Sequence, residues 1–374
     1  MIYVIKKDGT KELFNSRKIV AAVNKSAARI LYTFSEEEQD FICRFAEEHA
    51  ASLGKNEIQI QEMHNIVEGA LERVNPAVAK SYRDYRNYKL DFIHMMDDVY
   101  TKSQAIRYIG ESNANTDSAL VATKRSLIFN ELNKELYRKF FMNRNELQAC
   151  KDGYIYIHDQ SARLDTMNCC LFDVAAVLSG GFEMGNVWYN EPKTLDTAFD
   201  VMGDIILSTA AQQYGGFTVP EVDKILAPYA KKSYDRYVEE FMKYSDPSWV
   251  GREEKAIERA LDKVRREYDQ GWQGIEYKLN TVGSSRGDYP FVTVTLGLGT
   301  GQFEKMCSMS LLAVHKGGQG KAGHKKPVLF PKIVFLYDEN IHGKGKISED
   351  VFEAGVDCSA KTMYPDWLSM SGKG

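Results

Sequence analysis

Two adjacent cysteines, Cys169 and Cys170, are the residues whose type and spacing best suit chemistry. Disulfide formation, metal ligation, core packing and thiol chemistry are the four possibilities. A disulfide between neighbours strains the intervening peptide, and neighbouring side chains diverge on a helix or a strand. If a helix begins near the pair, Cys170 joins an apolar stripe with Val174 and Leu178, whereas Cys169 shares its face with Asp173. We therefore expect Cys170 to pack and Cys169 to be the candidate for chemistry, with a purely structural role for both as the alternative.

The common metal and nucleotide motifs are incomplete in this sequence. Residues 297–301, "GLGTG", give G-x-G-x-G instead of G-x-G-x-x-G, and no acidic residue follows where a ribose would need one. The stretch "GGQGKAGHKK" lacks the G-K-[ST] ending of a P-loop, so we interpret it as a basic loop. There is no C-x-x-C pair and no H-E-x-x-H, and we predict no metal site in this chain.

Composition and charge narrow the class of protein. The 374 residues are 44% apolar, enough for substantial cores, and the formal net charge is −4. This charge argues against duplex nucleic acid as a partner, because such binding neutralises many phosphates with Lys and Arg. The first residues lack the apolar core of a signal peptide, and no apolar run approaches the ~18–20 residues that span a bilayer. We expect no membrane partner, a cytoplasmic location and reduced thiols for the six irregularly spaced cysteines.

Turn and capping residues define a first block of hairpin and helices. Asp8-Gly9 predicts a hairpin turn within "VIKKDGTKEL". Asn15 is a good N-cap for the helix that follows. Ser35 and Glu38 form a capping-box pattern that predicts the start of a second helix.

Two further helices are expected in this block, and the second has an unusual surface. Residues 60–74 carry apolar side chains at helical spacing, and Asn75-Pro76 ends that helix and starts the next. Four cations recur there at every third residue, namely Lys80, Arg83, Arg86 and Lys89, with Tyr82, Tyr85 and Tyr88 interleaved. Positions three apart are neighbours on a helix, so the cations form a stripe. The stripe either faces phosphates or is a solvated face, and both remain open.

Strand and helix patterns mix in the rest of the chain. Residues 153–159, "GYIYIHD", alternate as strands do, and residues 290–299, "PFVTVTLGLG", also predict a strand. The apolar run "VLFPKIVFLYD" at 328–338 predicts a buried strand. Residues 231–266 are rich in Glu, Lys, Arg and Tyr, which is typical of solvated or interface helices. Strands interleaved with helices predict an α/β domain.

The first block resembles a known regulatory domain. Its segments "VIKKDGTKELFNSRKI" and "VAKSYRDYRNYKL" are similar to the ATP-cone, a nucleotide-binding domain of many ribonucleotide reductases. The resemblance covers residues 1–92 and implies a small, mostly helical domain with ATP or dATP as allosteric effectors. The implied effector-binding residues are Val4, Lys6, Lys7, Glu12, Asn15 and Lys18. Lysines can pair with phosphate oxygens, and a helix start favours anions. The position of Lys7 is often arginine in this family, and lysine lacks the bidentate fork.

The second block resembles the large subunit of the anaerobic, class III ribonucleotide reductase. The motifs that carry the resemblance occur in order in "MNCCLFDVAAVLSGGFEMGN", "AAQQYGGFTVPEVDKILAPY", "NTVGSSRGDYPF" and "CSAKTMYPDWLS". It implies that residues 93–374 form the N-terminal part of a ten-stranded α/β barrel of the glycyl-radical enzyme type. In that family a glycyl radical generates a thiyl radical, which abstracts the 3′ hydrogen of a ribonucleotide before the 2′ hydroxyl leaves as water.

The same resemblance assigns roles to individual residues. Cys169, preceded by Asn168, matches the cysteine that donates hydrogen on the opposite face of the ribose. The expected substrate-binding residues are Ser284, Ser285 and His158, and a glycine-rich turn is the alternative for the two serines. Cys307 and Cys358 match no catalytic motif and are expected to be structural.

Parts of the family pattern lie beyond this sequence. The finger-loop cysteine, the glycyl-radical segment and the four-cysteine zinc site have no counterpart before Gly374. We therefore expect the glycyl radical and zinc only in a C-terminal part, and we expect this chain alone to be inactive. The expected partners are ribonucleoside triphosphates, a radical-SAM activating enzyme, that C-terminal part and a second copy in a homodimer. The alternative is a non-catalytic nucleotide-sensing and assembly module.

Overall fold

The structure is a computed structural model that describes residues 2–6, 8–108, 119–164, 167–281 and 287–371. The chain divides into two compact units, Met1–Tyr100 and Thr101–Gly374, and each is described by itself. Within the described ranges, no helix has the length and apolar character needed to cross a membrane.

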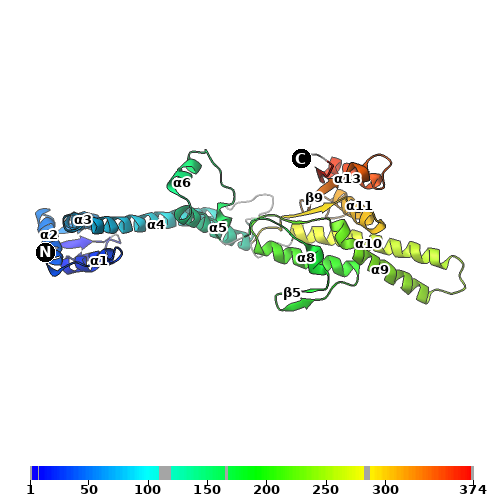
Figure 1. The fold of residues 1–374 in the computed structure, drawn as a ribbon, viewed down its shortest axis with the longest axis horizontal. Helices are drawn as coiled ribbons and strands as arrows, with labels where there is room; N and C mark the ends of the chain where they lie inside the picture. Colours follow the sequence, from blue (N-terminus) through cyan, green and yellow to red (C-terminus); the bar gives the residue numbers. More distant parts are fainter. Residues whose placement is uncertain (1, 7, 109–118, 165–166, 282–286, 372–374) are drawn as a thin grey trace. The chain divides into compact units, whose positions relative to one another are not determined.

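The first unit packs helices against a small sheet. Strands β1 (Tyr3–Ile5), β2 (Lys11–Leu13) and β3 (Glu57–Gln59) lie in the order β2-β1-β3, with β1 antiparallel to β2 and parallel to β3. The helices are α1 (Ser16–Ala28), α2 (Glu36–Ser52), α3 (Ile60–Val74) and α4 (Pro76–Tyr108), of which α4 continues past the end of the unit (Figure 1). Apolar side chains of these helices and Ile58 of β3 form one core. The prediction of a mostly helical domain is confirmed.

The turn and cap predictions for this unit are also confirmed. Gly9 has a φ of 82° at the turn between β1 and β2, a conformation open to glycine without a steric cost. The side chain of Asn15 accepts a 3.0 Å hydrogen bond from the N–H of Arg17 at the start of α1. Ser35 and Glu38 form the reciprocal hydrogen bonds of a capping box at the start of α2.

The second unit is built on a parallel sheet of five strands in the order β10-β9-β8-β7-β4. The strands are β4 (Cys170–Leu171), β7 (Phe217–Val219), β8 (Val292–Leu296), β9 (Lys332–Tyr337) and β10 (Asp366–Ser369). A separate hairpin consists of β5 (Phe182–Met184) and β6 (Val187–Tyr189). The α/β prediction is confirmed, and β8 and β9 occupy two of the segments predicted as strands.

Helices make up most of the rest of the second unit. They are α5 (Val121–Phe140), α6 (Arg144–Lys151), the short 3-10 helix η1 (Gln160–Ala162), α7 (Val174–Leu178), α8 (Leu195–Gln212), α9 (Val222–Tyr244), α10 (Arg252–Thr281), α11 (Gln302–Gly317), α12 (Glu339–His342) and α13 (Glu349–Thr362). Helix α10 contacts α8, α9 and α11 (Figure 1). It carries the fully buried Tyr268 and Trp272. A Cβ at Gly271 would overlap the ring of Phe199, so this glycine lets α8 and α10 approach closely.

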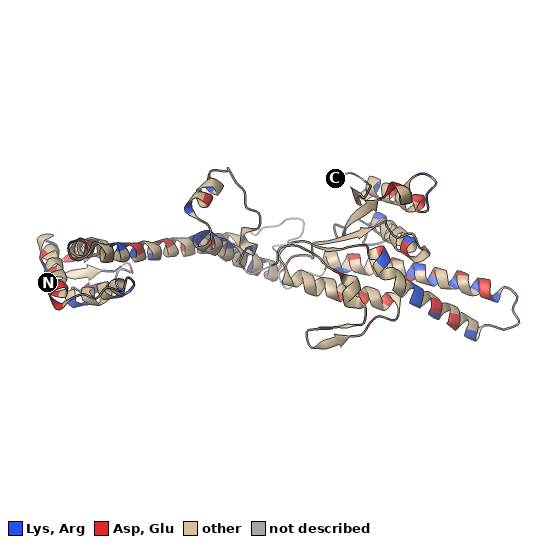
Figure 2. Ribbon diagram, in the orientation of Figure 1, with Lys and Arg blue, Asp and Glu red and all other residues tan. Residues whose placement is uncertain are grey.

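Helices α9 and α10 form a long antiparallel pair with a charged outer surface. Lys, Arg, Asp and Glu are interspersed along both helices (Figure 2). The buried face of α10 begins with small residues, Ala256 and Ala260, followed by Val264. This arrangement agrees with the prediction of solvated or interface helices at 231–266, because one stripe of each helix is covered.

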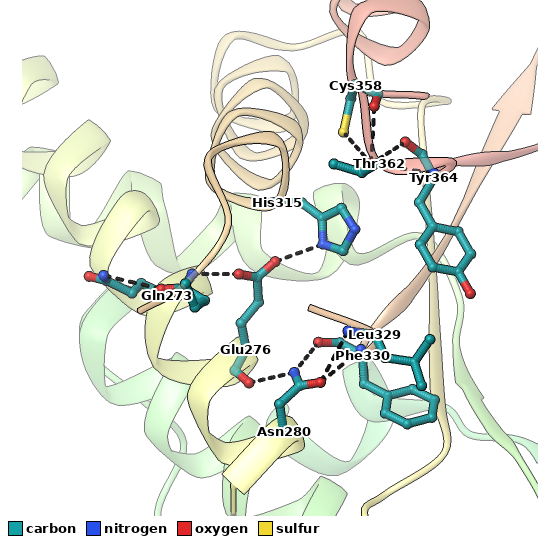
Figure 3. Close-up of polar contacts among 10 residues, drawn as sticks. Gln273, Glu276, Asn280, His315, Leu329, Phe330, Cys358, Thr362 and Tyr364 are labelled. Carbon is teal, nitrogen blue, oxygen red and sulfur yellow. Dashed lines mark hydrogen bonds and ion pairs between the residues drawn. The ribbon is translucent and has the colours of Figure 1, made fainter. Parts of the chain in front are cut away.

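A buried polar network joins α10, α11 and the segment before β9. The Glu276 carboxylate lies 2.8 Å from His315 Nδ1 and accepts a 2.5 Å hydrogen bond from the Gln319 amide. One turn along α10, the Asn280 side chain accepts a 3.2 Å hydrogen bond from the N–H of Phe330 (Figure 3). Glu276 and His315 are fully buried. These contacts replace the hydration that the Glu276 carboxylate and His315 Nδ1 lose on folding, whereas His315 Nε2 is buried without a hydrogen-bond partner.

The strand predicted at 153–159 is wrong. Tyr154 and Tyr156 are each 84% exposed, and no strand forms there. Alternation produces a strand only where a neighbouring strand accepts its backbone hydrogen bonds, and this segment has no such neighbour among the described residues.

The condition that would place Cys170 on a helical stripe with Val174 is not met, because the helix does not include the cysteines. Cys170 starts strand β4, and α7 begins only after Asp173, whose side chain accepts a 3.0 Å hydrogen bond from the N–H of Ala176. Pairing with β7 satisfies the backbone of β4, which gives this short segment an extended conformation.

Candidate functional site

Predicted effector residues meet at one pocket of the first unit, which we call the hairpin pocket. Its volume is about 180 Å³. The lining includes Val4, Lys6, Glu12, Asn15 and Lys18, so the structure brings together five of the six predicted residues. The sixth, Lys7, lies outside the described residues.

Opposite charges are paired within the hairpin pocket. Lys6 Nζ lies 2.6 Å from Glu12 Oε2, and Lys18 Nζ pairs with the other oxygen of the same carboxylate. Two ammonium groups around one carboxylate leave a net positive charge on these three side chains, which suits a phosphate. Asn15 places the start of α1 at the same pocket, where free N–H groups also favour anions.

Two lining residues of the hairpin pocket were missed by the sequence analysis. His64 of α3 and Tyr82 of α4 line it, and His64 Nδ1 lies 2.6 Å from the Tyr82 hydroxyl. Burial raises the pKa of Tyr82 to about 12, so its hydroxyl stays protonated at neutral pH. Aromatic rings offer a surface on which a base can stack. The interleaved tyrosines on α4 are a sequence signal for such a surface. Which pocket their rings face, however, depends on how α3 and α4 pack.

Two of the four cations in the stripe on α4 pair with carboxylates of α3. Arg83 pairs with Glu68 at 2.5 Å and also with Glu72. Arg86 Nη1 lies 3.2 Å from Glu68. The two central cations of the stripe therefore have protein partners, which argues against a row of phosphate contacts along α4.

Cys169 and Cys170 have different surroundings where strand β4 begins, since Cys170 is the first residue of that strand and Cys169 precedes it. Cys170 packs against the core of the second unit, and its Sγ donates a 3.1 Å hydrogen bond to Gln213 Oε1. Burial raises the pKa of the Cys170 thiol. Cys169 is exposed. We call Asn168, Cys169 and the facing segment 213–216 the cysteine site; its chemical role stays a prediction.

The structure does not test the three predicted substrate-binding residues. His158 is largely exposed, and its Nδ1 lies 2.6 Å from the carboxylate of the neighbouring Asp159. Ser284 and Ser285 lie outside the described residues. The structure therefore leaves all three as predictions.

Cys307 and Cys358 are fully buried, and burial raises the pKa of both thiols. A buried thiol with a raised pKa is a poor nucleophile, which fits the expected structural role. In the described parts of the chain, no group of three or more His, Cys, Asp or Glu side chains is placed to hold a metal ion.

The glycine-rich stretch after β8 is occupied by a carboxylate of the protein itself. Asp223, at the start of α9, accepts hydrogen bonds from the N–H groups of Gly297 at 3.0 Å and Gly299 at 3.1 Å. Burial raises the pKa of Asp223. The N–H groups that a dinucleotide phosphate would need are thus already used, which agrees with the incomplete motif.

Comparison with known proteins follows the same division of the chain. A family model described as "ATP cone domain" matches residues 2–91, and one described as "Anaerobic ribonucleoside-triphosphate reductase" matches residues 112–373. This chain belongs to the anaerobic ribonucleoside-triphosphate reductase family. The cysteine site falls within the second match, and the hairpin pocket falls within the first.

Individual relatives agree with the family assignment. The anaerobic ribonucleoside-triphosphate reductase of Haemophilus influenzae is 31% identical over 98% of this chain and 52% of its own length. The protein of the same name from Enterobacteria phage T4 is 34% identical over 69% of this chain and 41% of its own length. The chain thus spans about half the length of the relatives that it matches.

A solved structure shows the same fold. The anaerobic ribonucleotide reductase from Thermotoga maritima with glycerol in the active site has a TM-score of 0.50 at 15% identity, over 78% of this chain and 50% of that one. At this identity the similarity supports the fold alone.

Proposed function

We propose that this chain supplies a regulatory domain, residues 1–92, and the N-terminal part of a catalytic domain, residues 93–374, of an enzyme that reduces ribonucleoside triphosphates to deoxyribonucleoside triphosphates for DNA synthesis. Two family matches in the expected order support the proposal. The observation that carries it is the exposed Cys169 directly before the edge strand β4, inside the matched region.

Cys169 acts in this proposal as a hydrogen donor. A thiyl radical on the C-terminal part abstracts the 3′ hydrogen from one face of the ribose, and the 2′ hydroxyl leaves as water. The Cys169 thiol then supplies hydrogen from the other face. Formate or a thiol system provides the two electrons that replace the C–O bond by a C–H bond. Hydrogen transfer requires close placement, so a thiol that is already exposed suits this role.

The two end strands of the parallel sheet, as the described residues form it, support assembly with a C-terminal part. Both end strands expose apolar side chains: Leu171 of β4 is 79% exposed, and Leu368 of β10 is 51% exposed. Exposed strand edges pair readily with further strands. In the proposal, the remaining strands of the ten-stranded barrel, the glycyl radical and the zinc site come from that part.

ATP and dATP bind at the hairpin pocket in this proposal. Lys6 and Lys18 contact phosphate oxygens, and Glu12 holds both ammonium groups near the start of α1 before a nucleotide enters. We also propose that the enzyme is a homodimer, is activated by a radical-SAM enzyme and is located in the cytoplasm. The alternative, a non-catalytic nucleotide-sensing module, is favoured by the same pocket but leaves the cysteine site without a use.

Substitution of each cysteine tests the catalytic part of the proposal. The chain is combined with the C-terminal part of the enzyme, and reduction of a ribonucleoside triphosphate is measured. Cys169→Ser should abolish turnover without loss of folding, because oxygen is a poor hydrogen-atom donor. Cys170→Ala should keep turnover and lower the free energy of unfolding by about 1 kcal/mol, as small core truncations do. Turnover by Cys169→Ser at the wild-type rate would exclude the reductase role of this thiol and favour the sensing module.

A further inference from the structure

A β-bulge separates the two strands that form the cysteine site. Met167 bridges Gln213 in parallel orientation. Three residues later, Cys170 pairs with Phe217 and not with Gly216. One extra residue therefore lies on the 213–217 side. Bulges of this kind redirect side chains, and they are common beside active sites.

Gly215 lies where the two segments come closest. Its N–H donates a 2.6 Å hydrogen bond to the backbone oxygen of Asn168. A Cβ on Gly215 would lie 2.5 Å from that oxygen, 2.7 Å from Asn168 Oδ1 and 2.7 Å from Cys169 Sγ. These separations are shorter than van der Waals contact, so any side chain at position 215 must displace Asn168 and Cys169.

Backbone conformation does not explain the glycine at position 215. Its φ lies outside the left-handed region, so alanine could adopt the same backbone. Gly216 is similar in this respect, but a Cβ there would lie 2.8 Å from the ring of Phe291 and near no atom of Cys169. A glycine at position 215 is therefore needed to leave space for Asn168 and Cys169.

The neighbouring thiol is held by a different contact. Cys170 Sγ donates to Gln213, whose side chain is 3% exposed. Successive side chains of a strand point to opposite faces. The hydrogen bond thus keeps Cys170 on the core side, while the bulge determines where Cys169 lies.

We propose that Gly215 is a positioning residue for Cys169: its missing side chain leaves the space that the Cys169 sulfur occupies. The consequence for catalysis rests on the proposed function, whereas the placement of the sulfur does not. Gly215 is not itself a catalytic residue, since the reacting group is the thiol that it admits.

A cross-linking experiment on this chain tests the placement. In Gly215→Cys, the introduced thiol starts beside the Cys169 sulfur, within reach of a disulfide. Mild oxidation with diamide, followed by peptide mass spectrometry, should join the introduced thiol to Cys169. Gly274→Cys is the matched control, because a Cβ at Gly274 has no neighbour within 4 Å. The cross-link should persist with Cys170→Ser and vanish with Cys169→Ser. A bond to Cys170, or no bond, would overturn the placement.

Two alanine variants test the positioning role. Gly215→Ala should change the rate of Cys169 alkylation by about threefold or more, whereas Gly216→Ala should leave it nearly unchanged. In the assembled enzyme, Gly215→Ala should lower kcat about 100-fold with little change in KM, as expected for a displacement near 1 Å. Equal alkylation rates in both variants would refute the positioning role.

The outcomes separate this inference from the proposed function. A cross-link to Cys169 in a chain whose Cys169→Ser variant still turns over would refute the reductase role of the thiol and leave the placement intact. A missing cross-link with an inactive Cys169→Ser variant would refute the placement and leave the reductase role intact.

Discussion

The hairpin pocket and the cysteine site differ in where their residues come from. The predicted residues of the hairpin pocket lie between Val4 and Lys18, on one hairpin and the helix that follows it. The cysteine site joins Asn168 and Cys169 to a segment more than 40 residues later along the chain, across an irregular strand pairing. Local sequence motifs therefore specify the first site, whereas the second depends on the sheet being assembled.

The two units also differ in what holds their cores together. The core of the first unit is an apolar cluster of helix faces. The second unit adds buried polar groups, including Glu276, His315 and Asp223, to its apolar core. Removal of one partner from a buried polar contact leaves the other partner without its hydrogen bond, so the second unit should be the more sensitive to single substitutions.

Loss of the Glu276 carboxylate should produce the largest effect in this comparison. Glu276→Ala leaves the His315 ring and the Gln319 amide buried without their acceptor, which should lower the free energy of unfolding of the second unit by about 3–5 kcal/mol. Urea denaturation followed by tryptophan fluorescence measures this loss, and ATP binding to the first unit should not change. Asp200→Ala is the control, since that side chain is 83% exposed and pairs with Lys278 at 3.5 Å. Equal losses in both variants would contradict the role of the network.

Removal of one lysine from the hairpin pocket should have an intermediate effect. Lys6→Ala removes a lysine that contacts a phosphate in the proposed function, so the affinity for ATP and dATP should fall about tenfold, equivalent to ~1.4 kcal/mol. Isothermal calorimetry measures the change. Lys11→Ala is a matched control on the next strand, because Lys11 pairs with Glu57 and does not line the pocket. Unchanged affinity in Lys6→Ala would place the nucleotide elsewhere.

Loss of a helix cap in the first unit should have the smallest effect. Ser35→Ala removes the side-chain acceptor of the capping box and should lower the free energy of unfolding of that unit by about 1 kcal/mol. Ser52→Ala, at the exposed C-terminal end of the same helix, should cost less than about 0.5 kcal/mol. Thermal unfolding of both variants, monitored by circular dichroism, compares them. A larger loss in Ser52→Ala would contradict the cap assignment.

Sequence reasoning succeeded where structure is determined by near neighbours. The hairpin at Gly9 and the caps at Asn15 and Ser35 involve hydrogen bonds within a few residues, so their patterns can be read directly. The buried strands β8 and β9 were also predicted, because continuous apolar runs are typical of central parallel strands.

Sequence reasoning failed where contacts between distant segments determine the local structure. Strand β4 has two residues, and only its pairing with β7 gives it an extended conformation, so the helical pattern of Cys170 and Val174 was misleading. The packing of α3 on α4 turns His64 toward the hairpin pocket and pairs Arg83 with Glu68. The apolar periodicity of a single helix does not show in which direction the His64 or Arg83 side chain points.

The carboxylate of Asp223 has a mechanical consequence for the sheet. It links the start of α9 to the loop after β8, and the N–H of Glu221, just before α9, donates a 2.8 Å hydrogen bond to the Thr295 hydroxyl in β8. Two successive strand-to-helix connections are thereby coupled into one stiff piece at the carboxyl ends of adjacent strands. Any hinge motion in this unit should bend around that piece, because bending through it would expose a buried carboxylate and break several hydrogen bonds at once.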